Sequence, residues 1–275
     1  MTPPPRRQPD AVVEPVVSRV RIRYAKRGRM RFASHRDFAR ALERALRLAD
    51  VPIAHSAGFT PHPKVSYASA ATTGARSEAE YVEIGLTREV DVEVLRRALD
   101  AALPPGLDVL ECVNAAGGSL SDRLDASAWR IELPGVDVVA ARRALAGFLA
   151  ADSVVVARRT KGGQRDVDVR AAVVTATITG GPRPDAAGEP GATGGARPAG
   201  GIVCAIIELV VRLTTPAARP DDVLAGLTRF GLRPTGPARA TRLAQGLLER
   251  DDRLADPLAP DRAAVHPARS PSAED

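Results

Sequence analysis

Three of the four histidines of this chain fall within 28 positions, at His35, His55 and His62, and Arg31 and Lys64 lie in the same stretch. Imidazole can take up or release a proton near neutral pH. Guanidinium and ammonium groups bind phosphate oxygens. The combination favours a site for an anion. It could be a binding pocket, or a general base and general acid acting on a phosphodiester while arginines stabilise the developing negative charge.

A metal site is the alternative reading of the same histidines. If they converged, neutral imidazoles could ligate a divalent ion, with Asp37 as a further ligand or as the group that orients a ring. The sequence contains no HExxH and no paired CxxC, and its two cysteines, Cys112 and Cys204, are far apart. We therefore predict no metal and no cofactor. The three histidines remain candidate catalytic residues.

Positive charge is concentrated around these histidines. Residues 19–50 contain eleven basic and three acidic residues, a formal charge of +8, whereas the whole chain carries +6. A uniform preference for arginine cannot produce this asymmetry. A polyanion such as RNA is the partner that this charge distribution predicts. An acidic protein surface is the other possibility.

A strand and a helix must position this charge. Alternation of apolar and basic residues over 19–24 predicts a strand whose arginines, Arg19, Arg21 and Arg23, face solvent. Ser34 and Asp37 form a capping-box pattern at the start of a helix over 35–49. On that helix the apolar residues share one side, and the opposite side carries Arg36, Arg40, Arg44 and Arg47. These four arginines are predicted to contact phosphate.

The remaining pattern predicts an α+β fold. Strands at 64–70, 80–86 and 107–113 and a helix at 91–102 complete a βαββαβ ferredoxin-like unit over residues 16–115. A second such unit is predicted over 116–245, interrupted by a flexible Gly/Pro-rich insertion at 180–201. Residues 1–15 and 246–275 are predicted to be mobile, disordered tails. The alternating acids Glu78, Glu80 and Glu83 are expected to form a solvated face.

Several classes of protein are not supported. No apolar run is long enough to cross a bilayer and no secretory signal is evident, so we predict a cytoplasmic protein without a membrane partner. Phosphate-loop and nucleophile-elbow motifs do not occur in the sequence. A radical SAM enzyme needs three closely spaced cysteines for its iron–sulfur cluster, so this chain is not one itself.

The sequence resembles the radical-SAM-linked family, a domain of unknown function. The matching segments are KRGRMRFASHRD and HSAGFTPHPK, followed by Gly74 and SEAEY, with weaker matches in DVR at 168–170, RP at 219–220 and ARATR at 238–242. The resemblance spans about residues 18–245. It implies an accessory role beside a separate B12-binding radical SAM protein, in a genetic setting of RNA processing.

Together, residues and resemblance predict an accessory protein that binds RNA or a ribonucleoprotein. Phosphate and substrate contacts are expected from Arg31, His35, Arg36, Arg40, Arg44, Arg47, His55, His62 and Lys64. Nothing in the sequence indicates specificity for DNA. The alternatives are a histidine-dependent ribonuclease-like enzyme and a protein–protein adaptor that binds no RNA.

Overall fold

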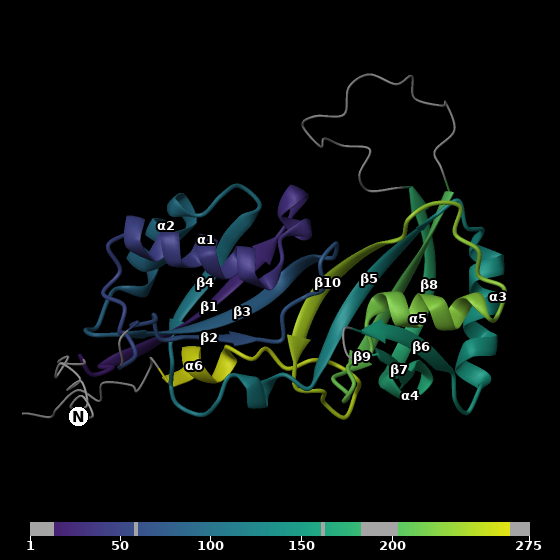
Figure 1. Cartoon of the computed structure of the whole chain (residues 1–275). Coiled ribbons are helices and arrows are strands. Elements are labelled where there is room, and N and C mark those ends of the chain that lie inside the picture. Colours follow the sequence, from purple (N-terminus) through teal and green to yellow (C-terminus); the bar gives the residue numbers. More distant parts are fainter. Residues whose placement is uncertain (1–13, 58–59, 161–162, 183–202, 265–275) are drawn as a thin grey trace, which may run out of the picture.

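A computed structural model describes residues 14–57, 60–160, 163–182 and 203–264 (Figure 1). The predicted N-terminal tail lies outside this range except for residues 14 and 15. Of the predicted insertion, only residues 180–182 are described, and they end a strand.

The first half of the chain forms a four-stranded antiparallel arrangement. Its strands are β1 (Ser18–Lys26), β2 (Val65–Ala68), β3 (Arg76–Leu86) and β4 (Leu107–Asn114), in the spatial order β4-β1-β3-β2. Helices α1 (His35–Leu48) and α2 (Val92–Ala102) cover one face of these strands (Figure 1). Buried apolar side chains hold the helices on the strands, because Phe38, Leu42 and Leu46 of α1 pack with Val20 and Ile22 of β1.

The second half adds four more strands in the order β10-β5-β9-β8. They are β5 (Ala126–Pro134), β8 (Val173–Pro182), β9 (Val203–Arg212) and β10 (Arg239–Gly246). Helices α3 (Val138–Ala150) and α5 (Pro220–Thr228) pack around a second apolar core that includes Phe148, Ile131 and Leu227. A separate hairpin of β6 (Val155–Thr160) and β7 (Gly163–Asp168) leads into the short helix α4 (Val169–Ala172).

The two halves meet where β3 and β10 pair in parallel, and we call this contact the junction. Thr241 stands opposite Arg76, and Arg242 stands opposite Ser77. The described strands thereby form one mixed sheet of eight strands plus the hairpin. The predicted α+β class is confirmed. Two tandem ferredoxin-like units, and a domain boundary near residue 115, stay predictions.

A buried ion pair holds the junction together. The Arg242 Nη1 atom lies 3.0 Å from Glu80 Oε1, and the two side chains are 6% and 2% exposed. The same nitrogen donates to the Ser69 carbonyl oxygen at 2.6 Å, while the guanidinium lies over the ring of Trp129. Burial lowers the pKa of Arg242, and the charge of Glu80 opposes that shift. The expectation that Glu80 belongs to a solvated face is wrong, because β10 covers it.

A second buried network corrects two further predictions. Arg21, expected to face solvent, is 1% exposed and donates to both carboxylate oxygens of Asp261. Asp261 belongs to α6 (Ala259–Ala264), which lies on the face of the first half opposite α1 and α2 (Figure 1). Leu258, just before α6, is fully buried in a small apolar cluster. Residues 247–264 are thus part of the fold, and the prediction of a tail that is disordered from residue 246 is wrong for them.

Arg242→Met tests whether the junction depends on this ion pair. Removing one partner of a buried pair leaves the other charge without compensation, so we expect a loss of about 3–5 kcal/mol in the free energy of unfolding. Urea denaturation measures it. The matched control is Arg130→Met, because Arg130 and Glu208 form a pair on β5 and β9 with side chains 44% and 42% exposed. That change should cost at most about 1 kcal/mol, and equal losses in the two variants would contradict the account.

Candidate functional site

The arginine face of α1 consists of Arg36, Arg40, Arg44 and Arg47, and all four side chains are exposed. Within the described residues none of them forms an ion pair. The predicted capping box is confirmed: the Ser34 hydroxyl accepts from the Asp37 backbone N–H at 3.2 Å, and Asp37 accepts from the Ser34 N–H at 3.0 Å. The cap fixes where the helix begins and therefore which residues face solvent.

His35 is positioned by an aromatic stack at the start of α1. Its ring meets Tyr67 edge-on with centroids 4.6 Å apart, and Phe38 stacks on Tyr24 at 4.2 Å. The imidazole is exposed and borders a cavity of about 20 Å³, which has room for about one water molecule. Burial raises the pKa of the neighbouring Tyr67 hydroxyl to about 12, so this tyrosine stays protonated near neutral pH. His35 is available to solvent or to a bound ligand.

His55 and His62 lie together elsewhere. They line one cavity of about 480 Å³ with Arg47, Glu43 and Asp50. Backbone contacts close their loop. The Ser56 N–H donates to the His62 carbonyl oxygen at 2.8 Å, and His55 and Pro63 form an isolated antiparallel β-bridge. After Pro52 the described backbone makes isolated bridges, such as that between Ile53 and Leu86. Lys64 follows this loop. Its N–H donates to the Ala54 carbonyl oxygen at 2.7 Å, and its carbonyl oxygen accepts from the Gly85 N–H at 2.9 Å.

The length of α1 separates the histidines into two places. His35 begins the helix and Arg47 lies in its last turn, and twelve residues at 1.5 Å rise place them about 18 Å apart along the axis. The cavity that holds His55 and His62 is at the Arg47 end. Neither cavity contains Arg31, which lines a third one. In the described residues, no three side chains among His, Cys, Asp and Glu gather as a metal site would require.

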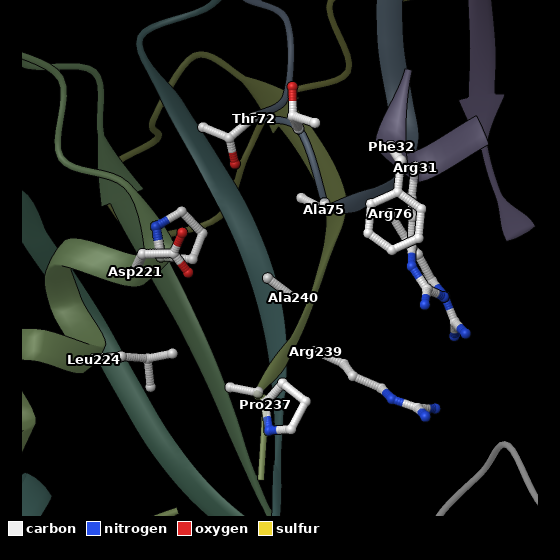
Figure 2. Close-up of a pocket in the computed structure, with 14 residues that line it drawn as sticks. Arg31, Phe32, Thr72, Ala75, Arg76, Asp221, Leu224, Pro237, Arg239 and Ala240 are labelled. Atoms are coloured by element: carbon white, nitrogen blue, oxygen red, sulfur yellow. The ribbon is translucent and has the colours of Figure 1, made fainter. Parts of the chain in front are cut away.

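A pocket of about 300 Å³ lies at the junction of the two halves (Figure 2). Arg31 and Phe32 come from the 3₁₀ turn Gly28–Phe32, and Arg76 begins β3. Arg239 begins β10, and Asp221 lies in the first turn of α5. We call this the junction pocket. Figure 2 shows the three guanidinium groups extending toward the same side, with Asp221 and Leu224 across from them.

Backbone contacts fix the wall of the junction pocket. The Gly74 N–H donates to the Arg31 carbonyl oxygen at 2.7 Å, and Gly74 has a φ of +97°, which a residue with a Cβ rarely adopts. The Ala71 N–H donates to Glu80 at 2.9 Å, so the acid of the junction pair also anchors this loop. Arg76 and Arg239 were not predicted as site residues, although the ARATR segment contains one of them. Their proximity depends on the pairing of β3 with β10, which local periodicity does not reveal.

Residues 19–220 match the model of a family described as "Uncharacterized protein conserved in bacteria (DUF2344)", and the chain belongs to this family. That match carries no link to a radical SAM protein. No curated protein matches the chain. Among the described helices, none has the length and apolar character needed to span a bilayer.

Gly74→Ala tests the backbone conformation that ties the pocket loop to Arg31. A side chain at a positive φ is strained, so we expect the free energy of unfolding to fall by about 1–2 kcal/mol. Gly236→Ala is the control, because Gly236 has open space around its Cβ position and no positive φ. Thermal or urea unfolding measures both. A Gly74 variant as stable as its control would show that this φ is not required.

Thiol chemistry is predicted to be absent from the native protein. Cys112 and Cys204 are buried, and burial raises the pKa of the Cys112 thiol to about 12. Since the thiolate is the reactive form, neither cysteine should react with a thiol reagent within minutes at pH 8, and both should react once the protein is unfolded in guanidinium. Rapid labelling of the folded protein would contradict the described burial.

Proposed function

We propose that this protein binds RNA, alone or within a ribonucleoprotein, through the arginine face of α1. The observation that carries the proposal is that four exposed arginines share one face of a single capped helix and form no ion pair within the described residues. Elsewhere, arginines such as Arg21, Arg123 and Arg242 bond carboxylates. Contacts to phosphate oxygens need exposed guanidinium groups, and binding of this kind is strongly dependent on salt.

We further propose that the protein acts as an accessory to a separate radical SAM enzyme in the cytoplasm. This part rests on the resemblance of KRGRMRFASHRD and HSAGFTPHPK to the radical-SAM-linked family. RNA held on the arginine face would be presented to that partner for modification. The two halves would then be related ferredoxin-like units. In each half the four sheet strands, counted in chain order, lie in the spatial order fourth, first, third, second: β4-β1-β3-β2 and β10-β5-β9-β8. This shared order supports the relation.

A second candidate function is histidine-dependent cleavage of RNA. It is favoured by one observation, the shared cavity of His55 and His62 with Arg47. Two imidazoles at one cavity can serve as general base and general acid, with the arginine stabilising charge. His55→Ala and His62→Ala should then each abolish cleavage of a labelled RNA while binding persists. Binding without any cleavage by the wild type would rule this function out.

Changing Arg36, Arg40 and Arg44 together to Gln tests RNA binding. Each lost phosphate contact lowers the slope of log affinity against log salt by about 0.7 for single strands, so three losses should reduce it by about 2. Fluorescence anisotropy with a labelled single-stranded RNA, titrated at several salt concentrations, measures affinity and slope.

The control for this triple variant removes the same charge from another place. Arg142, Arg143 and Arg229 are exposed residues of the second half, and their change to Gln should leave the slope nearly unaltered. Equal effects of the two triple variants would show that only net charge matters. Absence of RNA binding by the wild type would leave the protein–protein adaptor as the function.

A further inference from the structure

The junction pocket has the chemistry of a site for an anion with an attached ring. Its lining contains three arginines and one aspartate, a formal excess of two positive charges. A guanidinium group carries five N–H donors in a planar fork, so an arginine that already has one partner can still donate to a phosphate. At about 300 Å³ the cavity is at the lower end of the range of about 300–1,000 Å³ that is usual for small-ligand sites.

An aromatic side chain stands beside these cations. Phe32 is 59% exposed although it lines the pocket, and the Arg31 guanidinium carbon lies 4.6 Å from its ring centroid. The guanidinium covers one face of this ring, so a nucleobase can stack on the other face of Phe32 or on the outer side of the guanidinium plane. Asp221, across the pocket, can accept a hydrogen bond from a ribose hydroxyl or a base amino group (Figure 2).

We propose that the junction pocket binds a nucleoside phosphate, with Arg76 and Arg239 on the phosphate and Phe32 against the base. The ligand is either a free nucleotide or the phosphorylated end of an RNA. The site is separate from the arginine face of α1, because it is built from the turn at residues 28–32, the start of β3, the start of β10 and α5. Its existence does not depend on RNA binding to that face.

Titration calorimetry tests the proposal with the four ribonucleoside 5′-monophosphates, each titrated separately, and with inorganic phosphate. A short RNA with a 5′-phosphate is compared with the same RNA ending in a 5′-hydroxyl. We expect at least one nucleotide, or the 5′-phosphorylated RNA in preference to its hydroxyl form, to bind. If free nucleotides bind as tightly as the 5′-phosphorylated RNA, the ligand is a free nucleotide. If the 5′-phosphorylated RNA binds more tightly, the ligand is the end of an RNA. Binding of none of them overturns the proposal.

Variants locate the binding. Arg76→Gln with Arg239→Gln should weaken nucleotide binding at least tenfold, whereas the matched change of Arg142 and Arg143 to Gln should not alter it. Phe32→Leu, at an exposed position where folding is not at risk, should weaken nucleotide binding at least about fivefold and leave inorganic phosphate unaffected. Nucleotide binding that all these variants retain would place the ligand elsewhere and contradict the proposal. Loss of RNA binding in the Arg36, Arg40 and Arg44 variant with nucleotide binding retained would separate the two sites.

Discussion

The ion pair between Arg242 and Glu80 is the constraint on which the arrangement of both halves depends. It is buried, it joins β10 to β3, and each partner makes a second contact, since Glu80 accepts from the Ala71 N–H and Arg242 donates to the Ser69 carbonyl oxygen. The pair thus fixes strand pairing and the loop leading into β3 at the same time. A charged pair at this position costs desolvation free energy, which the hydrogen bonds to Ala71 and Ser69 help to offset. The junction pocket follows, since Arg76 and Arg239 come from the strands that this pair aligns.

Two groups of arginines in this chain differ in burial and in partners. Arg21 and Arg123 bond the buried carboxylate of Asp261, and Arg242 bonds the buried carboxylate of Glu80, so their charges are used within the fold. The arginine face of α1 projects into solvent. The total charge of the sequence therefore overstates what a partner can meet, and the positions of the exposed cations matter more than their number. The capped start of α1 decides those positions.

Local pattern in the sequence was enough to predict the layer around α1. The capping box of Ser34 and Asp37, and the spacing of Phe38, Leu42 and Leu46, determine the helix and its exposed side without reference to the rest of the chain. Predictions failed where distant segments pair. Arg21 is buried by Asp261, which is 240 residues away, and Glu80 by Arg242, 162 residues away. The three histidines looked like one cluster in sequence, but the length of α1 puts His35 at one end of the helix and His55 with His62 at the other.

The most direct test of RNA binding through α1 is ultraviolet crosslinking of the tagged protein in its own cells, followed by mass spectrometry of the peptides that carry RNA adducts. RNA binding through α1 predicts a defined RNA and adducts concentrated in peptides covering residues 35–48. Absence of RNA above background, or adducts confined to the second half of the chain, would contradict it.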